Sequence, residues 1–142
     1  MTYFADLSES TMACCGDPVR AVGWLTKAHD YTTGDTDEAF QWRLKQLCEH
    51  WIASSSELGF AVYLGHHTCE WCGLTQGQGN LGVPASSLLY VAPEMVHHYV
   101  SVHRYRPPAA FVDAVMDCPL PGTIEYADLV RPFRSRLRRY DG

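Results

Sequence analysis

His66-His67-Thr68-Cys69-Glu70-Trp71-Cys72-Gly73 places two histidines and a Cys-x-x-Cys turn within eight residues. Further histidines follow downstream, as the pair His97-His98 and as His103. Cysteine sulfur and histidine nitrogen are the ligands of tetrahedral zinc sites, and a tight turn lets both thiolates face one point. This stretch therefore predicts a zinc site in the middle of the chain.

The segments around this turn predict a zinc-finger-like ββα unit over residues 59–106. The aromatic and branched residues from Gly59 to Leu64 are typical of a strand that leads into the turn. The glycine-rich residues 73–84 favour an enlarged hairpin, and Ser87 to Val91 predicts a further strand. Pro93 occupies a helix-start position, so we expect a helix from Pro93 to His103.

Two other helices are predicted from the spacing of apolar residues. One runs from about Thr36 to Ala53, with Asp35 and Glu38 in capping-box positions and the following serines ending it. The other runs from Ala109 to about Asp117. A short strand or anchor is expected at Val22, Trp24 and Leu25. The predicted fold class is α+β, with a small antiparallel sheet and about three helices.

The spacing ranks five candidate ligands. Cys69, Cys72, His98 and His103 form the first choice, because four residues separate the two histidines, as in Cys₂His₂ sites. His67 is the alternative to His103, which would then support the site from outside the metal shell. The 25 residues between Cys72 and His98 exceed the dozen or so of a minimal finger. A redox dithiol is disfavoured because glycine-rich sequence, not a helix, follows Cys72.

Composition limits the classes of function. The 142 residues fit a single domain, and a formal charge of −5 is unevenly spread. Residues 1–130 carry six basic and fifteen acidic side chains, a net charge of −9, whereas residues 131–142 form a basic C-terminal tail of net charge +4. An acidic body makes broad nucleic-acid binding unlikely on electrostatic grounds. The sequence shows no signal peptide or long apolar run, so we expect no membrane partner, a cytoplasmic location and reduced cysteines.

Three functional hypotheses follow. The first is a zinc-stabilised domain that binds an unknown protein partner, in a regulatory or toxin-neutralising setting, because no catalytic motif is present and an acidic body suits a basic partner. The second is a zinc hydrolase with an open metal position and Glu70 or Glu94 as the base. The third is a nucleic-acid-binding zinc module that uses the arginine tail. An exposed Trp71 would mark a contact surface.

Several motifs occur together along the chain: Met1-Thr2-Tyr3-Phe4-Ala5-Asp6-Leu7-Ser8, Val22-Gly23-Trp24-Leu25 with His29, Tyr90-Val91-Ala92-Pro93, His98-Tyr99-Val100, and Tyr105-Arg106-Pro107-Pro108 with Phe111. With the His67/Cys69/Cys72 knuckle and His103, they make residues 1–117 resemble a bacterial family of small uncharacterised proteins, a domain of unknown function. The resemblance implies no established activity.

The resemblance does imply which residues match the family motif, namely His67, Cys69, Cys72, His98 and His103. It leaves His66 and His97 as bystanders. The chain departs from the family pattern at Cys14-Cys15, where similar sequences are richer in tyrosine and proline. A vicinal pair rarely converges on one metal ion, so we interpret Cys14-Cys15 as a loop.

Overall fold

The computed structural model describes residues 2–61 and 66–138. Within them, five helices surround a three-stranded and a two-stranded sheet, which confirms the predicted α+β class. The elements are β1 (Val19–Ala21), α1 (Glu38–Glu49), α2 (Trp51–Leu58), β2 (His67–Thr68), β3 (Gln76–Gly77), β4 (Asn80–Pro84), β5 (Leu89–Pro93), α3 (Val96–His103), α4 (Ala109–Asp117) and α5 (Ile124–Arg134).

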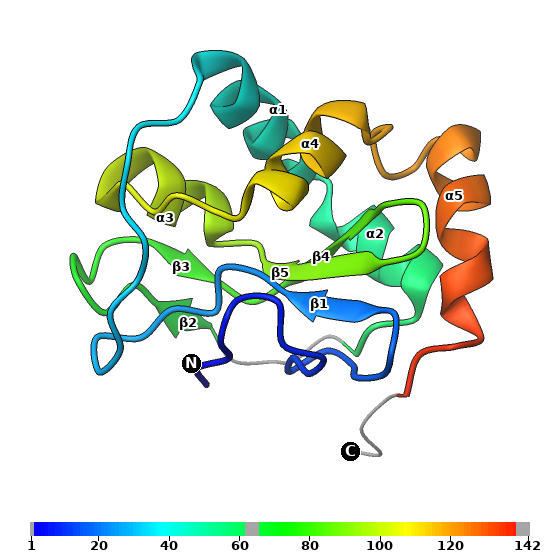
Figure 1. Ribbon diagram of the computed structural model, residues 1–142, viewed down its shortest axis with the longest axis horizontal. Coiled ribbons are helices and arrows are strands. Elements are labelled where there is room, and N and C mark those ends of the chain that lie inside the picture. The colour runs from blue at the N-terminus through cyan, green and yellow to red at the C-terminus, as the bar shows by residue number, and fades with distance from the viewer. Residues whose placement is uncertain (1, 62–65, 139–142) are drawn as a thin grey trace.

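The three-stranded sheet has the order β1-β5-β4 and forms the centre of the molecule. β4 pairs with β5 in antiparallel register, but β1 pairs with β5 in parallel, so the sheet is not wholly antiparallel. Every residue of β4 and β5 is buried. The helices α2, α4 and α5 contact β4, and the N-terminal segment runs along the edge of β1, where the Leu7 N–H donates to the Ala21 carbonyl. Figure 1 shows α1, α3 and α4 above the sheet. Strands covered on both faces lose the apolar–polar alternation of a half-exposed sheet.

The helix predicted from Thr36 to Ala53 is two helices. α1 ends at Glu49, His50 caps both helices, and α2 starts at Trp51 and continues through the serines that were expected to stop the helix. The hydroxyls of Ser54 and Ser55 are buried against β4: Ser54 accepts a hydrogen bond from the Gly82 N–H, and Ser55 donates to the Asn80 carbonyl. Serine favours helix ends because its hydroxyl competes for backbone groups, and here a neighbouring strand satisfies it instead.

A strand was predicted from Gly59 to Leu64. The structure describes residues 59–61 of that stretch, and none of them is in a strand. Gly59 ends α2 in the left-handed conformation with φ 72°, a backbone geometry that glycine adopts without strain. Residues 62–65 lie outside the described residues. The strand that enters the Cys-x-x-Cys turn is β2, which pairs with β3.

Two other boundaries differ from the prediction, and one agrees with it. Pro93 is the last residue of β5 and not the start of a helix, and α3 begins three residues later at Val96. A strand or anchor was expected at Val22, Trp24 and Leu25. The strand, β1, lies just before these residues in the chain, and their side chains are buried. α4 has the predicted bounds.

The basic residues from 131 onward begin inside a helix. α5 contains Arg131 and Arg134, and its Val130 and Phe133 are buried. Beyond it, Leu137 is buried, and Arg138 exchanges backbone hydrogen bonds of 2.8 and 2.9 Å with Cys15. Residues 131–138 are thus packed on the body of the protein. About three helices were predicted from the sequence, and the two that were not predicted are α2 and α5. These two helices contact each other and β4.

Candidate metal centre

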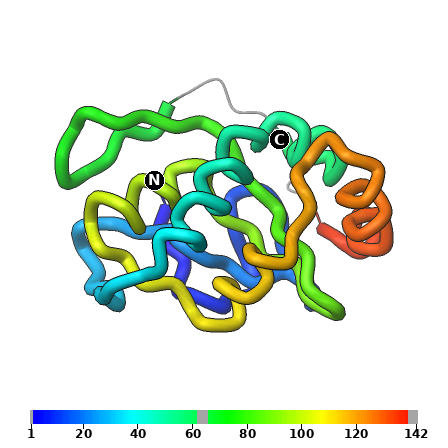
Figure 2. Tube along the Cα trace, turned by 90° about the horizontal axis from the view of Figure 1, so that it is seen from above, coloured from blue at the N-terminus to red at the C-terminus, as the bar shows by residue number. Residues whose placement is uncertain are grey.

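The Cys-x-x-Cys turn lies in the loop that joins β2 to β3. The Cys69 N–H donates to the Thr75 carbonyl over 2.8 Å, and the Gly73 N–H donates back to the Cys69 carbonyl over 2.9 Å. Gly73 has φ 66°, the left-handed geometry that reverses the chain there. These bonds hold Cys69 and Cys72 on the same side of a tight loop. Figure 2 shows this hairpin projecting at one end of the molecule.

α3 carries the two histidines that face this turn. His98 lies in the middle of the helix and His103 is its last residue. Arg104 then adopts φ 54°, and the N–H groups of Arg104 and Tyr105 both donate to the Tyr99 carbonyl, which ends the helix. The 25 residues between Cys72 and His98 are occupied by β3, β4 and β5. The hairpin of a minimal finger is thus extended here by two strands of the central sheet.

The four ligand atoms of Cys69, Cys72, His98 and His103 all lie within 4.8 Å of one another. The Cys69 sulfur is 3.3 Å from Nε2 of His103, and the Cys72 sulfur is 3.4 Å from Nε2 of His98. The two Nε2 atoms are 3.2 Å apart. This cluster could hold a metal ion.

The distances fit the edges of a tetrahedral zinc site. Metal distances of about 2.3 Å to sulfur and about 2.0 to 2.1 Å to nitrogen place two nitrogens about 3.3 Å apart, and a sulfur and a nitrogen about 3.6 Å apart. Hydrogen bonds alone explain the arrangement less well, because Nε2 of a neutral imidazole takes part in one hydrogen bond, either as the donor or as the acceptor. Nε2 of His103 contacts both Cys69 and His98, so one hydrogen bond leaves the other contact unexplained.

Local electrostatics favour the metal-binding forms of Cys72 and His98. The pKa of Cys72 is lowered, first because the backbone N–H of Leu74 donates to its sulfur, and further by Cys69 and Thr75. The pKa of His98 is also lowered, chiefly by burial and then by the nearby charges of His103 and His97. A thiolate and a neutral imidazole are the forms that bind a metal. Sequence reasoning missed the Leu74 contribution, because that hydrogen bond depends on the loop conformation.

Aromatic side chains cover the cluster. The ring of Trp71 packs against those of Tyr31, Tyr99 and His103, with centroids 5.4, 5.8 and 5.5 Å away. Trp71 is therefore only partly exposed, and the prediction that it marks a contact surface gives way to a packing role. Its neighbour Leu74, by contrast, is 87% exposed. The contact between Tyr31 and Trp71 joins residues forty positions apart and could not be predicted from their spacing.

The other predicted site residues lie elsewhere. His67 is outside the four-residue cluster and lines a small cavity with Gly77 and Glu94, and burial lowers the pKa of His67. Glu94 accepts hydrogen bonds from the backbone N–H groups of Gln78 and Gly79, which anchors the loop between β3 and β4. Glu70 is exposed and accepts from the Lys27 N–H over 3.3 Å. Both candidate bases thus have structural partners.

The cysteines outside the cluster are not assembled into a site in the described part of the chain. No disulfide joins any of the six cysteines. Cys48 is buried, and burial raises its pKa to about 12. Burial likewise raises the pKa of Cys118 to about 12. Cys14 is fully buried beside Cys15 in a loop.

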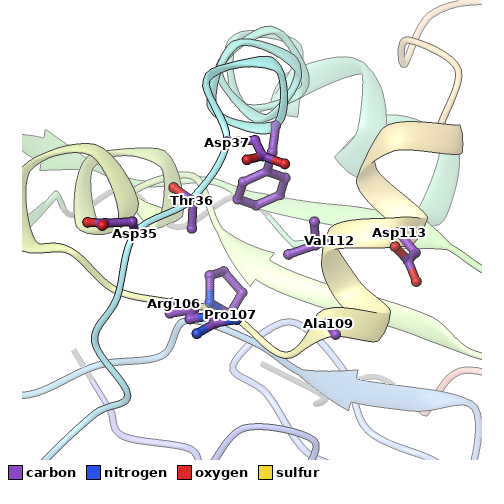
Figure 3. Close-up of a pocket in the computed structure, with 9 residues that line it drawn as sticks. Asp35, Thr36, Asp37, Arg106, Pro107, Ala109, Val112 and Asp113 are labelled. Carbon is purple, nitrogen blue, oxygen red and sulfur yellow. The ribbon is translucent and has the colours of Figure 1, made fainter.

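A separate cleft of about 290 Å³ lies between the segment that enters α1 and the start of α4. Figure 3 shows Asp35, Thr36 and Asp37 on one side of it, and Arg106 and Val112 on the other. Acidic and basic groups share this cleft, and Phe40 contributes an apolar wall. No cysteine or histidine is among the described residues that line it, and it shares no residue with the metal-ligand cluster.

Fold and cluster together define a small α+β protein with a Cys₂His₂ group of metal-ligand type. The chain belongs to a family described as a domain of unknown function, DUF7919, which matches residues 2–116. The match includes the whole cluster and ends within α4, before α5. Comparisons with curated proteins and with solved structures give no match. In the described residues, no helix has both the length and the apolar character needed to span a membrane.

Proposed function

We propose that this protein is a protein-binding module in which Cys69, Cys72, His98 and His103 hold a structural zinc ion. The observation that carries the proposal is the convergence of four soft ligand atoms within 4.8 Å. Two thiolates and two imidazoles suit zinc better than magnesium or calcium, which prefer oxygen ligands. Four protein ligands also fill a tetrahedral shell, as in structural sites.

A catalytic zinc ion needs a position for water, and the surroundings of the cluster favour the structural alternative. A zinc hydrolase would require one of the four ligands to leave the metal. It would also need a base, and both Glu70 and Glu94 are engaged with backbone N–H groups. These contacts support a metal ion that holds the β2–β3 hairpin against α3.

Elemental analysis of the purified chain, together with thermal melting before and after chelation, tests the metal. We expect one zinc ion per chain and a large loss of stability on chelation, because structural zinc contributes about 10–16 kcal/mol in small fingers. A substoichiometric trace of metal, or a melting curve indifferent to chelator, would contradict the proposal. Absorption of the cobalt form reports the ligand number, and a tetrahedral S₂N₂ spectrum would reject the open-site hydrolase.

Protein binding is supported by the exposed Leu74 at the tip of this hairpin. The Leu74 side chain is 87% exposed and offers an apolar contact to a partner. Because a metal ion would hold the backbone of this turn in place, binding there costs less conformational entropy. The test is co-purification of a tagged chain at native expression, compared with Leu74→Ser. Leu129→Ser is the matched control, because Leu129 lies on α5 and is 48% exposed. Recovery of no protein, or equal recovery with both variants, would contradict this role for Leu74.

A further inference from the structure

A hollow of about 420 Å³ lies between the N-terminal segment and the loop that follows β1. Its size falls in the range of roughly 300–1,000 Å³ that is common for ligand sites. Tyr3, Phe4 and Tyr31 supply aromatic walls, and Asp6 and Asp30 supply carboxylates. Aromatic rings beside carboxylates are the surroundings that attract an organic cation, through the ring faces and through charge.

Each aromatic wall is held by another ring. Tyr3 stacks on His29 with centroids 3.7 Å apart, and Phe4 packs edge-on against Trp24 at 5.6 Å. Tyr31 donates a hydrogen bond to the carbonyl of the cluster residue His103 over 2.9 Å. The walls are thus ordered before a ligand arrives, which reduces the entropy lost on binding.

The Asp6 side chain accepts hydrogen bonds from two donors. One carboxylate oxygen accepts from the Gly23 N–H over 3.1 Å, and the other accepts from the Tyr105 hydroxyl over 2.7 Å. Burial, followed by the charge of Asp6, raises the pKa of Tyr105, which therefore keeps its proton and remains a donor. A carboxylate accepts about four hydrogen bonds, so these two leave capacity for a ligand.

The charges that line this hollow are unbalanced. No lysine, arginine or histidine is among the described residues that line it, whereas Asp6 and Asp30 both do. The cleft in Figure 3 differs, because Arg106 already stands among its aspartates. A cation that enters the hollow near Tyr3 therefore meets two negative charges and no repelling positive side chain from its lining.

We propose that this hollow receives a lysine or arginine side chain of a basic protein partner. The hydrocarbon stem packs along Tyr3, Phe4 and Tyr31 while the charged end approaches Asp6 and Asp30. The assignment rests on the proposed protein-binding function and names the chemistry of the partner. It agrees with the −9 net charge of residues 1–130, which attracts a basic surface at long range.

The test is an NMR titration of the ¹⁵N-labelled, zinc-loaded full chain with N-acetyl-lysine methylamide and with the corresponding arginine derivative. The corresponding glutamate derivative is the control ligand. We expect saturable shifts of the amides of residues 3–6 and 30–32 with both cations at about physiological salt, which screens the diffuse attraction of the acidic body. Tyr3→Phe keeps the ring and should leave the affinity unchanged, whereas Tyr3→Ala should weaken it about threefold.

Asp30→Asn removes an exposed charge at the rim of the hollow and should also weaken the affinity about threefold. Asp113→Asn is the matched control, because Asp113 is an exposed aspartate of the other cleft. The inference is overturned by unsaturable shifts, by equal shifts with the glutamate derivative, or by equal effects of Asp30→Asn and Asp113→Asn. Such a result in a zinc-loaded chain rejects the cation hollow alone, whereas absence of zinc or of a partner rejects the proposed function.

Discussion

Nε2 of His98 lies 3.2 Å from Nε2 of His103, although the two residues are five positions apart on α3. Two imidazole nitrogens at this distance repel one another unless a proton or a metal ion lies between them. The Cys72 and Cys69 sulfurs lie 3.4 and 3.3 Å from these same nitrogens. A metal ion binds the lone pairs of all four atoms at once, whereas a single proton is shared between only two of them.

Cys72→Ser should abolish stoichiometric zinc binding and unfold the β2–β3 hairpin. The expected loss is of the order of the binding free energy of a structural zinc ion, about 10 kcal/mol, which is comparable to the net stability of a whole protein of this size. Cys15→Ser is the control, because Cys15 is partly exposed and holds Arg138 only through its backbone. Zinc content and circular dichroism of the two variants are the measurements. Equal zinc content would contradict the ligand role of Cys72.

His67→Ala should retain one zinc ion per chain, whereas His98→Ala should not. His67 lines a cavity next to Gly77 and Glu94 and is not in the cluster, while His98 contributes Nε2 to it. Competition with a chromogenic chelator measures the affinity of each variant. Zinc loss from His67→Ala as large as that from His98→Ala would restore His67 as a ligand.

Glu94→Ala should destabilise the protein by about 2–4 kcal/mol without removing the metal. The carboxylate accepts from the N–H groups of Gln78 and Gly79, and a hydrogen bond to a charged group contributes about 1.5–3 kcal/mol. The sum over the two bonds is reduced because Glu94 is only half-buried, so water replaces part of the lost interaction. Glu94→Gln keeps an acceptor oxygen, so it should cost less than Glu94→Ala. Urea denaturation measures both. A stability equal to that of the unchanged protein would contradict the anchoring role of Glu94.

Ser54→Ala should lower the free energy of unfolding by about 1–3 kcal/mol, because the buried N–H of Gly82 and hydroxyl of Tyr126 each lose a partner. Ser56→Ala, at an exposed position of the same helix, should have no cost and gain slightly from the higher helix propensity of alanine. Thermal denaturation of the pair separates the buried hydrogen bonds from propensity. Equal melting temperatures would show that the Ser54 network contributes nothing.

The sequence predicted the elements whose signals are local. Apolar spacing placed α4 correctly, and the Cys-x-x-Cys and His-x₄-His spacings selected the residues that the structure brings together. It misplaced the end of the first helix, because Ser54 and Ser55 are satisfied by β4, which lies about 25 residues away along the chain. It identified residues 131–142 only as a basic tail, and the burial of Phe133 and Leu137 within that stretch is visible only in the structure.

The sequence by itself thus determined the α+β class and the chemistry of the donors, because turn and helix periodicity depend on neighbouring residues. The tertiary structure alone decided that His103 and not His67 shares a point with Cys69 and Cys72. It also decided that Tyr3 and Tyr31 form one hollow with Asp6 and Asp30. These contacts depend on how β4, β5 and α3 pack against one another. Packing brings together residues that are far apart along the chain, and no periodic sequence pattern predicts which of them touch.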